Sequence, residues 1–534
     1  MSKCLNCGGE VRFDIKSQML ICSSCGSMDD PKEQRESADY AQDAESEFTL
    51  FVCPQCGGRV YSTDNSINGF CSYCGSNVIL RSRLEKMKTP RSLAPFMITK
   101  EACKARYLNF VKKALFVPDE IKKEEYLDNF RGIYMPYWGY DARISGFLSL
   151  YGTKTIREGG SVYGQSYKCR GWLDAQYQGI FYDASTAFDD HFSFQIAPFD
   201  SHALVDFNPA YLSGFYADMG DVGYRVYEDN ALRIAENKVF ESVQLHKAFP
   251  YTTFSDDQLE LFRPAMDVEI NGIYMSLFPV WFLSHKTDDR VSYAVVNGQT
   301  GRVAADLPVD RKKFVITSLL VAIPLFILLS FTILMTMDAL LITSEVFAAL
   351  AVALLCHMVN KITVRDLRLD DRGYLSRFNR LGYLERSRTE ATEEVRKRQM
   401  GILIKVGTFF LVSILFALSA IQPFIVKDNR MIKLFLQGLL SLALEIMVIK
   451  CTQLIYTGGR KNSGWMIAGI WTVFIASLIG FITMCIVPEF QMASYISIIL
   501  MMTGTLISQL AALGQYNIMT SMPLPQLDRK GGEE

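Results

Sequence analysis

Hydrophobic residues divide the chain into two parts that meet near residue 312. Up to that point apolar and polar residues are mixed as in globular domains, whereas long apolar runs make up most of the C-terminal part. A run of about 20 apolar residues can cross a hydrocarbon core about 30 Å thick. The pattern predicts an all-α transmembrane region at 312–516, followed by a polar tail at 517–534. Its six predicted spans are 314–337, 340–360, 401–425, 431–455, 464–487 and 491–514.

Two carboxylates interrupt these runs. Glu445 lies near the middle of the fourth run and Glu345 near the outer end of the second. A charged carboxylate at mid-bilayer costs about 3 kcal/mol, so each glutamate marks a candidate functional site. Two interpretations stay open: a protonated glutamate hydrogen-bonded inside a helix bundle, or a site for a proton or an ion.

Residues 90–311 have the pattern of an α+β domain. A helix is expected from Thr99, a suitable N-cap. The apolar face of this helix comprises Ala102, Ala105, Leu108 and Val111. Alternating residues rich in Tyr, Phe, Trp and Val predict strands over 132–144, 166–184, 272–286 and 291–309. Within the last of these, NGQTG predicts a turn. The tetrapeptide GIYM occurs in two of these runs and suggests two related halves.

Eight of the 13 cysteines form two copies of one pattern, CxxC followed by CxxC. The two sets are Cys4, Cys7, Cys22 and Cys25, and Cys53, Cys56, Cys71 and Cys74. All four cysteines of the second copy lie 49 residues after their counterparts, and a glycine follows each CxxC pair. Such glycines permit the turn that points backbone amides at thiolate sulfur. The pattern predicts two Cys4 zinc ribbons, at 1–27 and 51–80, and therefore two Zn²⁺ per chain.

Disulfides and iron–sulfur ligation are the alternatives to zinc. Disulfides need an oxidising compartment, and the residues before Cys4 lack the apolar core of a signal peptide. Each ribbon is too small to bury a sizeable core, so we expect the metal to supply most of its folding free energy. An acidic linker at 28–50 separates the two ribbons. The remaining cysteines are scattered singly and are expected to be buried small hydrophobes: 103, 169, 356, 451 and 485.

Lys and Arg predict the orientation in the membrane. The 360–400 loop carries 11 of them, whereas the opposite side has only Lys427 and Arg430. The positive-inside rule then places both termini and both ribbons in the cytoplasm of a multi-pass inner-membrane protein. The charge of the basic loop is mixed, which is typical of a solvated helix, and docking on anionic lipid is the alternative.

Enzymatic signatures are absent from the sequence. It contains no phosphate-binding Gly-x4-Gly-Lys-[Ser/Thr], no His-Glu-x-x-His and no Gly-x-Ser-x-Gly. The acid–histidine cluster at 189–191 is typical of a solvated turn. The net charge of −1 argues against a nucleic-acid-binding surface. We therefore expect a non-enzymatic protein.

Several separated motifs give the first 335 residues a family resemblance. The tandem CxxCGG ribbons, the segments at 92–142 and 198–218, and FPVWFLSHK before YAVVNGQTGRVAADLP resemble bacterial TFIIB-type zinc-ribbon membrane proteins. Members are often mislabelled primosomal or helicase-like, and the missing phosphate loop argues against that label here. The resemblance implies association with phage-shock protein A homologues and SPFH-domain proteins in an envelope-stress assembly. The chain departs from the shorter members by about four additional spans.

These observations predict a zinc-binding membrane scaffold or anchor with protein partners and lipid contact, and they leave a homo-oligomer open. A transporter or channel with a zinc-ribbon regulatory head is the first alternative. A nucleic-acid-binding membrane protein is the second.

Overall fold

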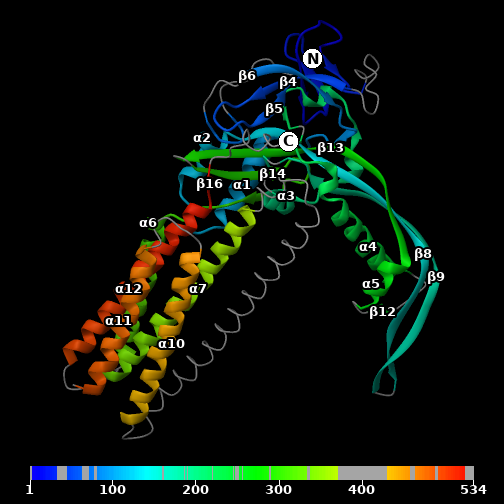
Figure 1. Cartoon of the computed structure of the whole chain (residues 1–534). Coiled ribbons are helices and arrows are strands. Elements are labelled where there is room, and N and C mark those ends of the chain that lie inside the picture. The colour runs from blue at the N-terminus through cyan, green and yellow to red at the C-terminus, as the bar shows by residue number, and fades with distance from the viewer. Residues whose placement is uncertain are drawn as a thin grey trace. The chain divides into compact units, whose positions relative to one another are not determined.

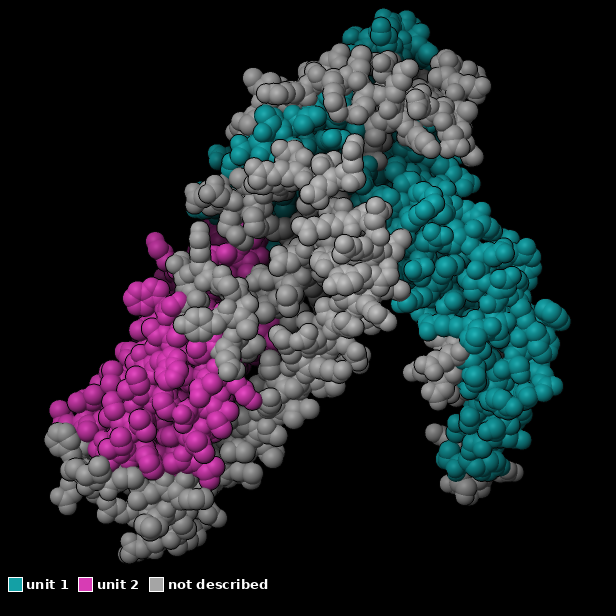
Figure 2. Space-filling model, in the orientation of Figure 1, with its two compact units in different colours: residues 1–113, 120–306, 523–534 teal, residues 114–119, 307–522 magenta. Residues whose placement is uncertain are grey.

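Two compact units make up the computed structural model (Figure 2). Unit 1 comprises Met1–Lys113, Glu120–Asp306 and Pro523–Glu534, and unit 2 comprises Ala114–Asp119 and Leu307–Met522. The structure describes residues 3–32, 45–62, 71–76, 81–158, 161–185, 187–188, 190–218, 220–244, 246, 252–254, 257–287, 290–332, 337–370, 430–457, 464–486 and 491–523.

The first cysteine repeat forms a small sheet of its own. Strands β1 (Val11–Asp14), β2 (Met19–Cys22) and β3 (Met28–Asp29) pair antiparallel. Val11 lies opposite Cys22 and Phe13 opposite Leu20, and all four side chains are buried. This alternation puts one face of the hairpin into a core, as the period of a strand requires.

The second cysteine repeat is part of the large sheet of unit 1. Its strands β4 (Glu45–Val52) and β5 (Arg59–Ser62) pair with each other, and β4 also pairs with β6 (Arg81–Lys88). On the other side, β5 pairs with β11 (Tyr216–Ala217) of the α+β domain. The second ribbon is therefore continuous with that domain rather than a separate module.

Strand β4 also shortens the predicted acidic linker. The linker was expected to include residues 45–50, but they form most of this strand. The antiparallel register puts Glu45 opposite Lys88 and Glu47 opposite Lys86.

A long antiparallel ladder forms the centre of the large sheet (Figure 1). Strands β8 (Arg131–Glu158) and β9 (Ser161–Asp183) make an extended hairpin, and β13 (Met266–Thr287) pairs with the first half of β8. Strand β14 (Arg290–Asn297) pairs with β13 and, after a turn, with β15 (Val303–Ala305). The predicted strands and the NGQTG turn are confirmed. Shorter strands complete the sheet: β7 (Ser92–Leu93), β10 (Val205–Asp206) and β12 (Thr252–Phe254).

The two GIYM segments lie on neighbouring strands. Gly132 pairs opposite Trp281 and Trp138 opposite Met275 in the β8–β13 ladder. This antiparallel pairing relates the two segments in space, and their duplication stays a prediction.

Helices and short turns of helix cover the sheet. Helix α4 (Glu228–Gln244) buries Ala235 and Phe240 in a core shared with Ile144 and Leu150 of β8. The others are α2 (Glu124–Leu127), α3 (Asp190–Ile196), α5 (Asp257–Phe262), η2 (Glu120–Lys122), η3 (Ser201–Ala203), η4 (Pro209–Leu212), η5 (Tyr224–Val226) and η6 (Arg263–Ala265).

Helix α1 (Lys100–Lys112) begins where the sequence predicts, but its buried face differs. The Thr99 hydroxyl accepts a hydrogen bond from the Ala102 amide at 3.2 Å and caps the helix. Cys103, Tyr107 and Val111 are buried, whereas Ala105 is exposed. The predicted face was right for Val111 and wrong for Ala105, while Ala102 and Leu108 are half-buried. The Tyr107 ring determines the buried face by packing on Phe130, with ring centroids 5.5 Å apart.

Helices dominate unit 2. They are α6 (Arg311–Thr332), α7 (Met337–Asp370), α10 (Arg430–Thr457), α11 (Gly464–Ile486) and α12 (Gln491–Met519), followed by β16 (Met522–Pro523). Buried Val352, Leu355, Val448, Ile470 and Val473 join α7, α10 and α11 in one core.

Three stretches are long and apolar enough to cross a membrane among the residues that the structure describes. They are Ala339–Lys361, Gly464–Thr483 and Met492–Met519. The prediction of six spans is thus supported for the second, fifth and sixth. The first and fourth are helical, as α6 and α10, and their crossing stays a prediction. The third, 401–425, and the 371–400 part of the basic loop lie outside the described residues.

Candidate metal centres

Four turns of the same geometry bring the ribbon cysteines together. In each turn the amide of the glycine after CxxC donates to the carbonyl of the first cysteine, at 2.9–3.0 Å. The φ angles of Gly8, Gly26, Gly57 and Gly75 lie between +68° and +73°, a region that glycine adopts at little cost. The predicted role of these glycines is confirmed.

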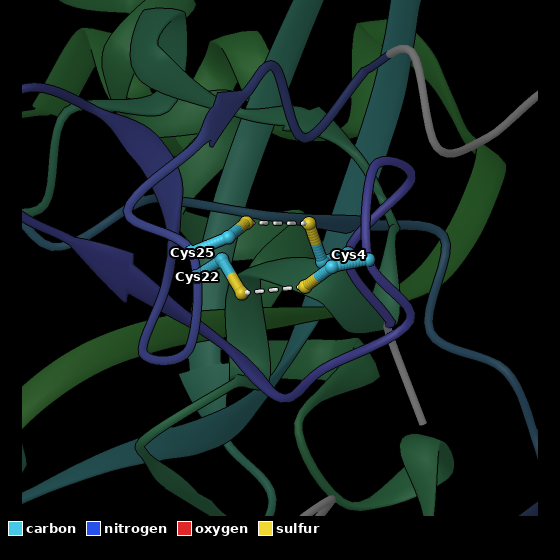
Figure 3. A group of neighbouring side chains, drawn as sticks. Cys4, Cys22 and Cys25 are labelled. Atoms are coloured by element: carbon cyan, nitrogen blue, oxygen red, sulfur yellow. Dashed lines mark hydrogen bonds between the residues drawn. The ribbon is translucent and has the colours of Figure 1, made fainter.

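The first centre combines Cys4 and Cys7, which precede β1, with Cys22 at the end of β2 and Cys25 before β3. The sulfurs of Cys4 and Cys25 lie 3.6 Å apart, and those of Cys7 and Cys22 lie 3.5 Å apart (Figure 3). Four sulfurs at Zn–S bonds of about 2.3 Å in a tetrahedron are separated by about 3.8 Å. The spacing therefore fits a tetrahedral metal site.

The second centre has the same arrangement. The sulfurs of Cys53 and Cys74 are 3.8 Å apart, and those of Cys56 and Cys71 are 3.7 Å apart. The ligand atoms in each group all lie within 4.8 Å of one another. Two Cys4 clusters able to hold a metal ion are thus present, as the sequence predicts.

Electrostatics also favours a bound cation at the second centre. The hydrogen bond with Cys53 raises the pKa of Cys56 and of Cys71 well above the usual range of a thiol. Four crowded thiols cannot all ionise without a compensating positive charge, which a bound metal ion supplies. At the first centre the Ser27 hydroxyl lowers the pKa of Cys25 to about 6. Its oxygen lies 2.9 Å from the sulfur of Cys4 and 3.1 Å from that of Cys25.

The two centres differ in exposure. Cys7 and Cys25 are exposed, whereas all four cysteines of the second centre are buried. The first ribbon is joined to the rest of unit 1 by a few contacts. The Phe13 ring packs on Tyr211 with centroids 5.1 Å apart, and Gln18 Nε2 donates to the Phe96 carbonyl at 2.9 Å.

A buried polar chain anchors the second centre. Tyr73, between two ligands, donates its hydroxyl to Asp218 Oδ2 at 2.7 Å, and Ser185 donates to the same oxygen at 2.5 Å. Tyr293 of β14 donates to the Tyr73 carbonyl at 2.6 Å. Burial raises the pKa of Asp218, so its hydrogen bonds offset a real desolvation cost. The sequence analysis missed Asp218, because nothing in the local pattern distinguishes it from nearby acids such as Asp221.

Lys286 brings a positive charge to the second centre. Its Nζ lies 3.3 Å from the Ser76 hydroxyl, and its backbone amide lies 3.1 Å from where a Cβ on Gly75 would sit. A metal ion with four thiolates carries a net charge of −2, which a nearby ammonium group stabilises. A side chain at position 75 would be strained by the φ of +68° and tight against this strand.

The remaining candidate residues from the sequence analysis lie away from the two metal centres or outside the described residues. Glu345 is buried between helices, whereas Glu445 is only half-buried. Four of the five single cysteines are buried as predicted, at 103, 169, 356 and 451, and the side chain of Cys485 lies outside the described residues. The side chains of the 189–191 cluster also lie outside them. Among the described residues no third group of three His, Cys, Asp or Glu comes close enough to hold a metal.

Comparison with known proteins finds a bacterial relative. The chain is 26% identical over 318 residues to the uncharacterized protein YdjG of Bacillus subtilis (strain 168), covering 58% of this chain and 91% of that protein. No family model matches the chain. No solved structure matches it either.

Proposed function

We propose that this protein is a zinc-binding, multi-pass membrane scaffold whose cytoplasmic head recruits proteins to an envelope-stress type assembly at the inner membrane. The observation that carries the proposal is the presence of two Cys4 clusters able to hold a metal in a chain that also has three helices apolar enough to span a membrane. Zinc is the metal that such thiolate sets ordinarily hold. The lysines and arginines of the 360–400 loop support the cytoplasmic placement of both termini.

The first ribbon is the recruiting module in this proposal. Leu5 in its first turn is 66% exposed and Met28 of β3 is 59% exposed. The two belong to adjoining segments, since the Leu5 amide donates to Asp29 Oδ2 at 3.4 Å. A rigid metal-clamped turn with an exposed apolar pair suits recognition of another protein. The second ribbon, whose ligands are buried, stabilises the fold of unit 1 in this proposal.

Affinity purification of tagged full-length protein from native membranes tests this division of roles. We expect a phage-shock protein A homologue or an SPFH-domain protein to co-purify. The double change Leu5→Asp with Met28→Asp should remove it and leave the zinc content unchanged. Leu261→Asp is the matched control, because Leu261 is another exposed leucine of unit 1, at 55% exposure. Retention of the partner by the double variant, or its loss in the control, contradicts the proposed role of the first ribbon.

A second candidate function, a transporter or channel with a zinc-ribbon head, is favoured by the carboxylate of Glu345 buried inside the helix bundle. Flux through proteoliposomes of the purified protein tests it. Ion flux that Glu345→Gln abolishes and Glu445→Gln leaves intact supports transport, and the absence of flux in the wild type contradicts it.

A further inference from the structure

A cluster of buried oxygen atoms lies inside the helix bundle of unit 2. Glu345 comes from α7, Gln437 and Ser441 from α10, and Ser477 from α11. Gln437 and Ser441 are four residues apart, so they share one face of their helix. Glu345, Gln437 and Ser477 are 0% exposed and Ser441 is 7% exposed.

The oxygens of Glu345, Ser441 and Ser477 make three close contacts with one another, but the two serines have only two hydroxyl protons to place between them. The Ser441 hydroxyl donates to Glu345 Oε1 at 2.7 Å, and the Ser477 hydroxyl donates to the same oxygen. The two hydroxyl oxygens also lie 2.7 Å apart. Each serine has a single hydroxyl proton, which its bond to Glu345 already uses. With an ionised carboxylate, the third contact therefore brings together two oxygens with no proton between them.

Two side chains of the cluster also have polar atoms without partners. Glu345 Oε2 and both the Oε1 and Nε2 atoms of Gln437 are buried and have no partner in hydrogen-bonding geometry, although the Gln437 amide lies near the Glu345 carboxylate. Leaving such groups unpaired costs about 1–3 kcal/mol each. Two of these unpaired atoms, Glu345 Oε2 and Gln437 Oε1, are oxygens that a bound cation can pair.

The cluster lies within the apolar part of the helices. Glu345 is six residues from the beginning of the stretch Ala339–Lys361, and Ser477 is six residues from the end of Gly464–Thr483. At 1.5 Å per residue both are about 9 Å inside the apolar region. Because Glu345 and Ser477 touch, these two helix ends lie on the same side of the bundle. An ionised carboxylate at this depth is costly, and a bound cation would compensate its charge.

The charge and the donor types restrict the ion. The ligands are one carboxylate, two hydroxyls and one amide oxygen, which suit a hard cation. Among the described residues no lysine, arginine or histidine forms an ion pair with Glu345. One negative charge is neutralised by one monovalent cation, and the close approach of the oxygens favours the smaller of the common ones. We propose that Glu345, Gln437, Ser441 and Ser477 form a binding site for one sodium ion. This site depends neither on the scaffold role nor on transport.

Sodium binding to the zinc-loaded, full-length protein in detergent tests the proposal. Melting temperature and the binding of radioactive Na⁺ are measured at fixed ionic strength, with choline chloride replacing NaCl and with KCl as a parallel series. We expect one Na⁺ per chain and a melting temperature that rises with NaCl, because a ligand stabilises the state that binds it. Choline should give no rise and K⁺ a smaller one.

Variants make the test specific. Glu345→Gln should lose Na⁺ binding, whereas Glu445→Gln, a change at the half-buried glutamate of α10, should keep it. If Glu345→Gln fails to fold, Ser441→Ala retains the carboxylate and should weaken Na⁺ binding about tenfold, the equivalent of one lost polar contact. Wild-type stability that responds to pH but not to Na⁺ would show a protonated glutamate and overturn the proposal. Equal Na⁺ binding by the wild type and Ser441→Ala overturns it as well.

Discussion

At the scale of single residues, the second metal centre depends on side chains far from its cysteines in sequence. Asp218 is buried 145 residues after Tyr73, whose hydroxyl it accepts. Its carboxylate also accepts the Ser185 hydroxyl and the Gly220 amide. This network fixes the turn between Cys71 and Cys74 to the α+β domain.

Tyr73→Phe should destabilise unit 1. The change removes one of the two hydroxyls on Asp218 Oδ2 in a fully buried setting, which costs about 1–3 kcal/mol. Chemical unfolding of the full-length protein in detergent, followed by tryptophan fluorescence, measures the change. Tyr151→Phe, at an exposed tyrosine of β8, should change the free energy of unfolding by less than about 0.5 kcal/mol. Equal effects of the two variants would show that the Tyr73–Asp218 bond contributes nothing.

Ser27→Ala should weaken metal binding at the first centre alone. The Ser27 hydroxyl contacts the sulfurs of Cys4 and Cys25, and losing such a second-layer contact reduces metal affinity about 10- to 100-fold. Competition with a chromophoric zinc chelator at neutral pH measures it. Ser17→Ala is the matched control in the same ribbon, where the hydroxyl donates to Asp14 Oδ2 at 2.8 Å. Unchanged zinc release from Ser27→Ala contradicts the role given to this hydroxyl.

The cysteines and the turn glycines could be predicted from the sequence, because a Cys4 site needs local CxxC turns and a fixed spacing. Asp218, Ser185 and Lys286 could not, because their partners lie more than 30 residues away and no local pattern marks them. Ser27 lies two residues after Cys25, so its proximity to the first centre could be predicted. Its role could not, because serine is common after a CxxC turn.

At the scale of elements, two similar repeats have different surroundings. The first forms β1–β3 by itself, whereas β4 and β5 of the second extend a larger sheet through β6 and β11. The repeat pattern alone predicted two equivalent modules. The pairing of β5 with the α+β domain depends on Tyr216–Ala217, a segment far away in the sequence. The sequence of the repeat alone therefore could not predict it.

Removing each centre should therefore have different consequences. Cys53→Ser with Cys56→Ser should lower the free energy of unfolding of unit 1 by about 4 kcal/mol or more. The remaining buried thiols would lose the metal ion, and β5 would lose its connection to the metal centre. Cys4→Ser with Cys7→Ser should disorder only the first ribbon. Hydrogen exchange of the full-length protein, compared for peptides of β1–β2 and of β8 and β13, measures the extent. Equal exchange in β8 for the two variants would contradict the integration of the second ribbon.

In the helical region, too, the local sequence pattern predicts the elements but not how their side chains pack. Apolar length located α7, α11 and α12, because the bilayer fixes the length of a span. Position in the apolar runs favoured Glu445, near the middle of its run, over Glu345, near the outer end. Packing favours Glu345 instead, since it accepts hydrogen bonds from Ser441 and Ser477 on two other helices.

At the scale of the whole molecule, the proposed function joins a zinc-binding head to a membrane region. The distribution of lysine and arginine predicts that an N-terminal epitope tag is protected from added protease in intact cells and digested only after the membrane is opened. A tag after residue 534 should behave in the same way, and digestion of either tag in intact cells contradicts the predicted topology.

The zinc content of full-length protein purified from membranes tests the central claim most directly. Elemental analysis should give two zinc ions per chain, and one in each of the variants Cys4→Ser with Cys7→Ser and Cys53→Ser with Cys56→Ser. Protein without zinc whose ribbon cysteines are disulfide-bonded, or that shows the visible absorbance of an iron–sulfur cluster, would contradict it.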